Sequence, residues 1–278
     1  MRFGSQIFES YSTPEQWLAI VKSKGLRAVY SPVQNASDAG EVRAYIDICK
    51  ENDLKIAEVG AWGYSLVSKS ASQREKAFDF AVKQLTLADK LGAATCVNVS
   101  GSRSGLWSGN DRDNFSPETF RMIVETVQRL IDRVQPENTT FSLEAMPWMF
   151  PDTLQSYREL YDAIDRKAFA VHYDPVNMIC THRSYWNHGA DMAEFIRYFA
   201  DNIKVVHMKD VHLDSQQNTI ITETQPGKGE LDYRTLLTEL NRLNPDLPVM
   251  TEHMDCECDS LNAEKYIRSI AEELNISM

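Results

Sequence analysis

Four acidic or imidazole side chains stand near the ends of short apolar runs. They are Glu144 in FSLEAMP, Asp174 in FAVHYDPVN, His207 in IKVVHMKD and Glu252 in PVMTEHM. A buried ionisable group must be neutralised or find a counter-charge, and one divalent cation would satisfy all four. Mixed carboxylate and imidazole ligands suit Mn²⁺, Co²⁺, Mg²⁺ or Zn²⁺. The pattern therefore predicts a ring of metal ligands, with loop caps or pairs to Lys and Arg as the alternative for each residue.

These runs belong to an eightfold alternation of short apolar runs and longer amphipathic stretches. The runs begin near Arg2, Arg27, Lys55, Thr95, Thr140, Phe169, Ile203 and Pro248. The stretches predicted as helices are Thr13 to Lys24, Asp38 to Glu51, Ser72 to Leu91, Ser116 to Val134, Thr153 to Ile164, Asp191 to Ala200, Asp232 to Leu243 and Ser260 to Leu274. Start signals such as Ser116-Pro117 and stop signals such as Gly92 support these boundaries.

Strands that alternate with helices pair in parallel, and eight units can close on themselves. We therefore expect one domain over residues 1–278, a single (β/α)8 TIM barrel of the α/β class. A doubly wound open sheet usually has a glycine-rich phosphate turn after its first strand, and RFGSQIFES has none. Three long irregular stretches are expected after strands, on the face where barrel enzymes keep their sites: Ser100 to Phe115, Pro175 to Gly189 and Val211 to Leu231.

Side-chain alternation tests whether the four residues can converge. His207 shares a strand face with Lys209, Asp174 with His172, and Glu252 with Met250, because successive side chains of a strand point to opposite faces. Were these faces to point into the barrel, the four ligands would meet. Glu58 in KIAEVGAW also has the parity of an inward residue, and we interpret it as a structural carboxylate.

Charge and composition narrow the class of partner. The net charge of −11 has no Lys/Arg-rich stretch, which argues against nucleic acid as the main partner. No apolar segment is long enough for a signal peptide or a membrane span, so we expect a cytoplasmic protein without a membrane partner. Five cysteines, an odd count, suggest reduced thiols. A zinc site at Cys256 and Cys258 is not expected, because a second cysteine pair is lacking.

The strings SLEAMP, DPVN, HMKD, PGKGELDY and TEH occur in this order, and together they resemble the xylose-isomerase-like sugar isomerase/epimerase family, which shares its barrel with endonuclease IV. The resemblance implies one divalent metal, Mn²⁺ as our first expectation, held by Glu144, Asp174, His207 and Glu252. It also implies that Glu144 and Glu252 form the acid/base pair. A metal stabilises the enediolate that forms when a proton next to a carbonyl is removed.

Two departures separate the chain from close relatives within that resemblance. Ketose 3-epimerases and endonuclease IV commonly have His three residues after the aspartate, where this chain has Asn177. Endonuclease IV also has an Asp-x-His pair before its Gly-x-Gly motif, and ITETQPGKG contains no His. A trinuclear zinc site and a DNA-repair function are therefore not expected.

The predicted substrate is a small carbohydrate. Indole rings stack on sugar rings and exclude water from a reactive enediolate, and four tryptophans follow predicted strands: Trp62, Trp107, Trp148 and Trp186. Asn177, His188 and Lys209 are further candidate substrate-binding residues. The alternative is packing between loops and helices for some of the tryptophans, and a salt bridge at a loop end for Lys209.

Several functions stay open at this point. The first is a metal-dependent sugar isomerase or epimerase. The second is a lyase or dehydratase that uses the same base on an oxo-sugar or oxo-glycoside. The third is a barrel that binds sugar or metal without turnover, and an endonuclease IV-like hydrolase is the least favoured. The resemblance further implies a homodimer or homotetramer.

Overall fold

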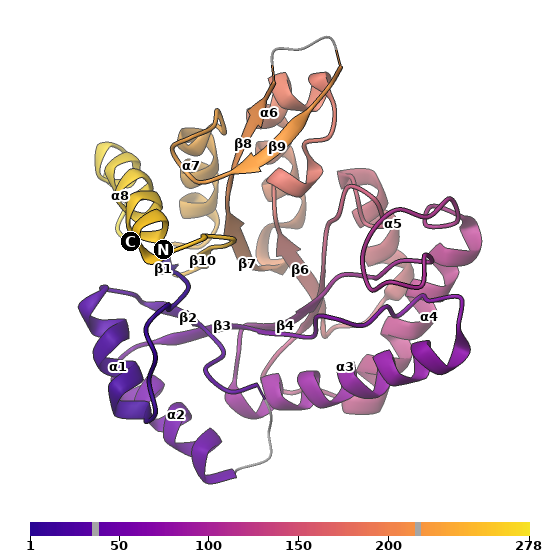
Figure 1. Ribbon diagram of the computed structural model, residues 1–278, viewed down its shortest axis with the longest axis horizontal. Coiled ribbons are helices and arrows are strands. Elements are labelled where there is room, and N and C mark those ends of the chain that lie inside the picture. The colour runs from indigo at the N-terminus through magenta and orange to yellow at the C-terminus, as the bar shows by residue number, and fades with distance from the viewer. Residues whose placement is uncertain (35–38, 215–217) are drawn as a thin grey trace. The chain divides into compact units, whose positions relative to one another are not determined.

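The computed structural model describes residues 1–34, 39–214 and 218–278 (Figure 1). Eight strands follow the eight predicted runs: β1 (Arg2–Gly4), β2 (Ala28–Tyr30), β3 (Lys55–Gly60), β4 (Thr95–Asn98), β5 (Phe141–Glu144), β6 (Phe169–Tyr173), β7 (Ile203–Met208) and β10 (Pro248–Thr251). Eight α-helices lie between and after them: α1 (Pro14–Ser23), α2 (Ala39–Glu51), α3 (Ala71–Leu91), α4 (Pro117–Val134), α5 (Leu154–Ile164), α6 (His182–Phe199), α7 (Tyr233–Leu243) and α8 (Glu257–Glu273). Asp38, the predicted first residue of the second helix, lies outside the described residues.

The eight strands form a closed barrel in the order β1-β10-β7-β6-β5-β4-β3-β2. Pairing is parallel, as in β5 and β6, where Phe141 is opposite Phe169 and Glu144 is opposite His172. In β7 and β10, Val206 is opposite Val249. The chain is therefore an α/β (β/α)8 TIM barrel, as the alternation predicted.

The chain divides into two compact units, one of residues 1–30, 44–57 and 173–278 and the other of residues 31–43 and 58–172. Two of their four boundaries fall inside strands β3 and β6, one inside helix α2, and one directly after β2. The predicted single domain stays a prediction.

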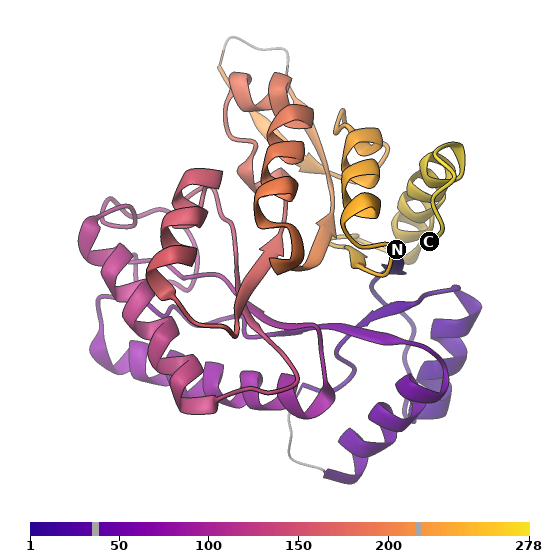
Figure 2. The same cartoon turned by 180° about the vertical axis from the view of Figure 1, so that it is seen from behind.

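The first unit packs α6, α7 and α8 beside β7, β10 and β1 (Figure 2). Tyr173 stacks on Phe195 of α6 with ring centroids 4.2 Å apart. Arg197 of α6 and Glu239 of α7 form an ion pair of 2.6 Å. The chain termini lie side by side, and the Met1 amino group donates a hydrogen bond to the Ser277 carbonyl (Figure 1). These contacts fix the strands whose ends carry the candidate ligands.

The second unit contains β4, β5, α3, α4 and α5, and these helices begin at hydroxyl caps, of which Ser116 was predicted. Ser116 accepts a hydrogen bond from the Thr119 amide, and Thr153 accepts one from Ser156. Both side chains satisfy amides that the first turn of a helix leaves without a partner. Gly92 ends α3 with φ of 63°, a left-handed conformation that glycine adopts at low cost. Local sequence signals therefore set these boundaries.

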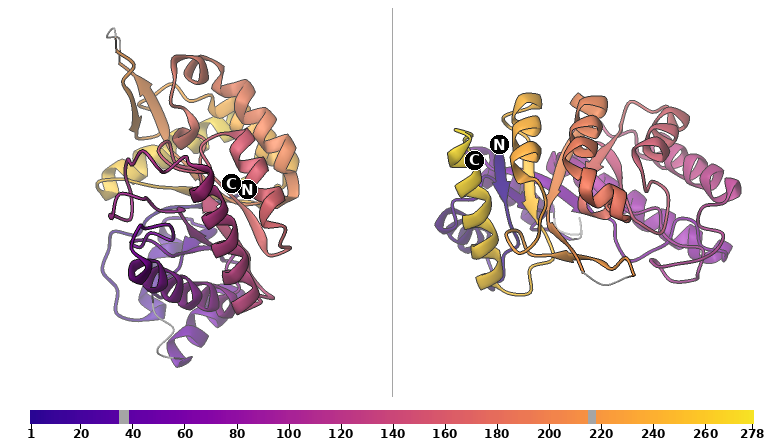
Figure 3. Two further views of the ribbon diagram at one scale, coloured as in Figure 1. Left: turned by 90° about the vertical axis from the view of Figure 1, so that its right-hand side faces the viewer. Right: turned by 90° about the horizontal axis from the view of Figure 1, so that it is seen from above.

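Two predictions about the irregular stretches were wrong. Helix α6 begins at His182, not at Asp191, because Thr181 and Ser184 form a capping box that starts the helix early. The stretch from Val211 to Leu231 contains an antiparallel hairpin, β8 (Asp210–Leu213) with β9 (Ile221–Thr224), whose two strands run side by side in Figure 3. The strands of this hairpin have four residues each, and polar residues interrupt the apolar ones, so they give no apolar run from which a strand could be predicted.

No helix in the described parts of the chain is both long enough and apolar enough to cross a membrane.

Candidate active site

Three of the four predicted ligands come together in the first unit. His207 lies on β7, Asp174 directly after β6, and Glu252 directly after β10. The His207 Nδ1 atom is 3.0 Å from Glu252 Oε2 and 3.8 Å from Asp174 Oδ2. One ligand atom of each residue lies within 4.8 Å of the others. The ends of parallel strands have brought together two carboxylates and an imidazole from distant parts of the sequence.

The backbone after β6 orients Asp174. Its Oδ1 accepts hydrogen bonds from the amides of Val176, at 3.0 Å, and Asn177, at 3.2 Å. These amides belong to the start of the 3₁₀ turn η1 (Val176–Met178). One carboxylate oxygen is thereby fixed, and Oδ2 is turned toward His207. Asn177, predicted to bind substrate, contributes its backbone amide to this arrangement.

Lys209 is the cation of the cluster. Its Nζ lies 2.8 Å from Asp174 Oδ2, 2.7 Å from Glu252 Oε2 and 3.3 Å from Glu223 Oε2. Only 1% of its side chain is exposed, so its ammonium contacts carboxylates in place of water. The strand parity that grouped Lys209 with His207 is confirmed by their shared partners, Asp174 and Glu252.

The cluster favours ionised carboxylates. Burial alone would raise the pKa of Asp174, but the charges of Lys209 and His207 hold this pKa below its ordinary value. Burial also opposes ionisation of Glu252, and the contacts with His207 and Lys209 hold its pKa well below the usual range. Both side chains are therefore anionic at neutral pH.

Two further residues of this cluster were missed by sequence reasoning. Glu223 on β9 accepts a hydrogen bond from His253 Nδ1 at 2.7 Å, and His253 Nε2 lies 3.5 Å from Glu252 Oε1. The hydrogen bond to Glu223 is the main cause that raises the pKa of His253. His253 has a φ of 57°, which points to a tightly determined turn after β10. The alternation in ITET, with Glu223 between two threonines, was the available signal.

Asp210 anchors the loop after β9. Its carboxylate accepts hydrogen bonds from four backbone amides, those of Val211, Gly227, Gly229 and Leu231. A Cβ atom on Gly229 would lie 2.4 Å from Asp210 Oδ1, so the close approach requires glycine. Asp210 therefore holds the PGKG loop that follows the hairpin.

The second unit contains Glu144 and a buried pair. Glu144 is the last residue of β5, and only 3% of it is exposed. Glu58 Oε2 lies 2.9 Å from His172 Nε2, with both side chains buried. The expectation that Glu58 is a structural carboxylate agrees with this geometry.

The tryptophans of the second unit have different surroundings. Trp107 is 38% exposed and lines a pocket of about 310 Å³ together with Tyr64, Leu106 and Lys76. The indole of Trp62 covers Gly60, where a Cβ atom would lie 2.2 Å from Nε1. The carbonyl of Trp148 accepts a hydrogen bond of 2.8 Å from Asn114. Of these three tryptophans, Trp107 is the one that lines the 310 Å³ pocket.

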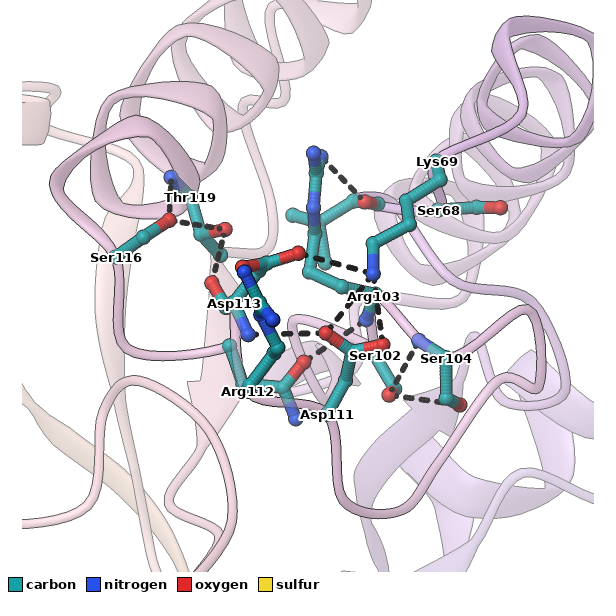
Figure 4. A network of polar contacts seen from close by, with 12 residues as sticks. Ser68, Lys69, Ser102, Arg103, Ser104, Asp111, Arg112, Asp113, Ser116 and Thr119 are labelled. Atoms are coloured by element: carbon teal, nitrogen blue, oxygen red, sulfur yellow. Dashed lines mark hydrogen bonds and ion pairs between the residues drawn. The ribbon is translucent and has the colours of Figure 1, made fainter.

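A polar network fixes the loop that carries Trp107 (Figure 4). Lys69 bridges Asp111 and Asp113, with 2.9 Å to each. The Arg103 guanidinium donates to the Val67 carbonyl at 3.0 Å. The Arg103 amide donates to Asn114 Oδ1 at 2.9 Å. The loop is therefore held by side chains and does not depend on a regular element.

Trp186 and His188 were predicted in a loop, and that placement was wrong because both lie in helix α6. Trp186 is 69% exposed. The His188 Nε2 atom accepts the Asp232 amide at 2.9 Å, which ties α6 to the first residue before α7. Their predicted contacts with substrate stay predictions.

The donor set of the first unit fits a divalent cation. Two carboxylates and one imidazole within 4.8 Å match the ligands used for Mn²⁺, Mg²⁺ or Zn²⁺, without selecting among them. The buried carboxylates already draw a cation, the Lys209 ammonium, to 2.8 and 2.7 Å. The chemistry of the residues therefore agrees with the metal site that the sequence predicted.

Comparison with known proteins identifies the family. The sequence profile described as "Xylose isomerase-like TIM barrel" matches residues 18–275. The chain belongs to this family of TIM barrels. No curated protein matches the sequence.

Solved structures with the same fold include an epimerase, a probable dehydratase and a magnesium complex. The 3-keto-D-glucoside 4-epimerase YcjR from E. coli has 16% identity and a TM-score of 0.69, with 99% of each chain covered. The probable 3-DHS dehydratase AsbF from Bacillus anthracis has 15% identity and a TM-score of 0.70, with 97% of this chain and 98% of that chain covered. A xylose isomerase-like protein from Mycobacterium smegmatis in complex with magnesium has 16% identity and a TM-score of 0.65, with 95% and 90% covered. At these identities the likeness concerns the fold.

Proposed function

We propose that the protein is a divalent-metal-dependent sugar isomerase or epimerase that removes a proton next to a carbonyl. The observation that carries this proposal is the cluster of Asp174, His207 and Glu252, with ligand atoms within 4.8 Å at the ends of three barrel strands. Ionised carboxylates with low pKa values are expected at a cation site. Sites of barrel enzymes lie at this end of the strands.

Glu144 is proposed as the fourth ligand. It is buried at the end of β5, which neighbours β6 in the barrel order. The sequence pattern assigned it the same relative position as the other three. A carboxylate there would complete the set of one imidazole and three carboxylates that the family resemblance implies.

Glu144 and Glu252 are proposed as the acid/base pair. When bound, the metal supplies Lewis-acid stabilisation for the enediolate. Glu252 suits a proton-transfer role because 17% of its side chain is exposed, whereas Asp174 is fully buried. Asp174 and His207 would hold the cation, and one glutamate would take the proton while the other returns one.

A carbohydrate substrate is supported by the aromatic surface of the second unit. Trp107 and Tyr64 flank the 310 Å³ pocket, and Lys76 and Ser68 line it with polar groups. Exposed aromatic rings beside hydrogen-bonding groups suit sugar rings. Trp62, Trp148, Trp186, Asn177, His188 and Lys209 remain proposed substrate contacts. Assembly into a homodimer or homotetramer also stays a prediction.

A lyase or dehydratase on an oxo-sugar or oxo-glycoside is the second candidate. The same proton abstraction can be followed by loss of a leaving group at the β-position. The fold shared with the probable dehydratase AsbF, at a TM-score of 0.70, favours keeping this alternative. The metal ligands and the base would be the same, and the shape of the substrate pocket would differ.

The test measures whether the metal-loaded protein exchanges substrate protons for solvent deuterium. The purified protein is loaded with Mn²⁺ and incubated in D₂O with a panel of ketoses, aldoses and 3-oxo-glycosides. We expect about one Mn²⁺ per chain and deuterium in product or recovered sugar. Glu144→Gln and Glu252→Gln should each slow exchange by about 10²-fold to 10⁴-fold, the usual contribution of a general acid or base. Product mass separates the candidates, since a lyase product has lost its leaving group.

Glu272→Gln is the matched control, because this glutamate is exposed on α8 and the same chemical change there should leave exchange unchanged. A protein that binds no divalent metal after reconstitution would overturn the proposal. Full exchange in Glu252→Gln with metal still bound would remove Glu252 from the acid/base pair.

A further inference from the structure

Lys209 occupies the space between two proposed metal ligands. Its Nζ lies 2.8 Å from Asp174 Oδ2 and 2.7 Å from Glu252 Oε2. These two oxygens are also the ones turned toward His207 Nδ1, at 3.8 and 3.0 Å. The ammonium therefore uses the same carboxylate oxygens that a metal held by these residues would use.

An ammonium and a divalent cation cannot both hold these oxygens at close range without strong repulsion. Metal–oxygen distances are about 2.0–2.6 Å for divalent ions such as Mg²⁺, Zn²⁺ and Ca²⁺. A metal bound to both oxygens would then lie within a few ångströms of the lysine nitrogen. Like charges at such a separation repel strongly where little water screens them, and Lys209 is 1% exposed. Metal binding must therefore compete with Lys209.

Glu223 gives the displaced lysine an alternative partner. Its Oε2 is 3.3 Å from Lys209 Nζ, and its Oε1 is held by His253 Nδ1 at 2.7 Å. Glu223 belongs to β9 of the hairpin and is not among the proposed metal ligands. A small movement of the lysine toward Glu223 would keep the ammonium paired while releasing the two ligand oxygens.

We propose that Lys209 is a built-in competitor of the metal, which moves from Asp174 and Glu252 to Glu223 when a divalent cation binds. The inference rests on the proposed function, because it takes Asp174 and Glu252 as metal ligands. It assigns the hairpin a role in setting metal affinity. Lys209 lowers the metal affinity, and Glu223 limits that loss because it accepts the displaced ammonium.

The test measures the dissociation constant of Mn²⁺ by calorimetry on the folded full-length chain, for wild type and variants. Lys209→Met keeps the length of the side chain and removes the charge. We expect it to bind Mn²⁺ about tenfold more tightly or more, a change of about 1.4 kcal/mol. Glu223→Gln should bind Mn²⁺ more weakly than wild type, since the lysine loses its second partner. In the double variant, Glu223→Gln should have no further effect.

Lys228→Met is the matched control. Lys228 is 60% exposed in the same unit, so it tests the loss of one positive charge without the contacts of Lys209. Its Mn²⁺ affinity should stay within about twofold of wild type, because exposed charges are screened.

The failures can be told apart. A wild-type protein that binds no Mn²⁺ contradicts the proposed function. Wild type that binds Mn²⁺ while Lys209→Met binds with equal or lower affinity overturns only the competition. Were Lys209→Met to misfold, Glu223→Gln would decide: weaker binding supports the competition, and unchanged or tighter binding overturns it.

Discussion

The two units each bury acidic and basic side chains, but they balance the charge differently. In the second unit, Glu58 meets His172 at 2.9 Å, one carboxylate for one imidazole. In the first unit, Lys209 faces three carboxylates, those of Asp174, Glu252 and Glu223. The imidazoles of His207 and His253 lie beside the same carboxylates. A single acid–imidazole pair can serve structure alone, whereas several carboxylates gathered at strand ends offer a divalent cation more than one anionic oxygen. The first unit is therefore where metal chemistry is to be sought in this barrel.

Disrupting the balanced pair should have the greatest consequence. Glu58→Ala or His172→Ala leaves one member of a buried, hydrogen-bonded acid–imidazole pair without its partner and should lower the free energy of unfolding by about 3–5 kcal/mol. The double variant should lose less stability than the sum of the two single variants, because no buried polar group is then left without its partner. Urea unfolding followed by far-ultraviolet circular dichroism measures all three values.

If the pair serves structure alone, the stability that the protein loses in these variants should not depend on metal. Unfolding is therefore repeated with excess Mn²⁺, and the losses should not change. Glu272→Ala on α8 is the control for removal of an exposed carboxylate and should change stability by less than about 0.5 kcal/mol. A loss at Glu58 that grows with Mn²⁺ concentration would show that the pair takes part in metal binding, and the two clusters would no longer differ in kind.

The second predicted effect is a loss of stability at low pH. Asp174 and Glu252 have pKa values below their ordinary values of 3.8 and 4.5, so the folded state favours their ionised forms. Their contribution to stability is complete above those ordinary values and is lost as the pH falls through the folded-state values. For protein treated with a chelator, the free energy of unfolding should fall below about pH 5, by on the order of 2 kcal/mol for this cluster.

Asp174→Asn supplies the control for the acid effect, because an amide cannot release a proton. Its stability should be lower than that of wild type at pH 7 and should depend less on pH between about 5 and 3. An equally steep pH dependence in Asp174→Asn would place the acid-sensitive groups elsewhere.

How far the sequence could predict this molecule differs between strands and loops. The eight barrel strands followed from apolar runs, because burial on both faces of a parallel strand demands them. The convergence of Asp174, His207 and Glu252 followed from their common position at strand ends. Sequence alone did not pair Lys209 with these carboxylates, because Lys209 was expected to bind substrate or to form a salt bridge at a loop end with no partner named.

The hairpin and the start of α6 depended on signals that periodicity does not reveal. The strands β8 and β9 pair with each other outside the barrel, so they need no long apolar run. The first turns of α6 are polar, and their start depends on the Thr181 and Ser184 cap. Glu223 was missed because only the hairpin brings it to Lys209, some fourteen residues away in the chain.

The most local of the predicted effects concerns the loop of the second unit, where the hydrogen bonds of Asn114 supplement the ion pairs of Lys69. Asn114 donates to the carbonyls of Gly109 and Trp148, at 3.0 and 2.8 Å, and accepts from the Arg103 amide at 2.9 Å. Asn114→Ala leaves these groups without that partner and should cost about 1–3 kcal/mol. Hydrogen exchange read by mass spectrometry should show faster exchange across residues 102–114. Exchange at the cluster of the first unit should be unchanged, because its charges are held by strand ends and by the hairpin. Faster exchange around His207 and Glu223 would mean that the loop network and the carboxylate cluster depend on one another, and that the contrast between the units is one of composition only.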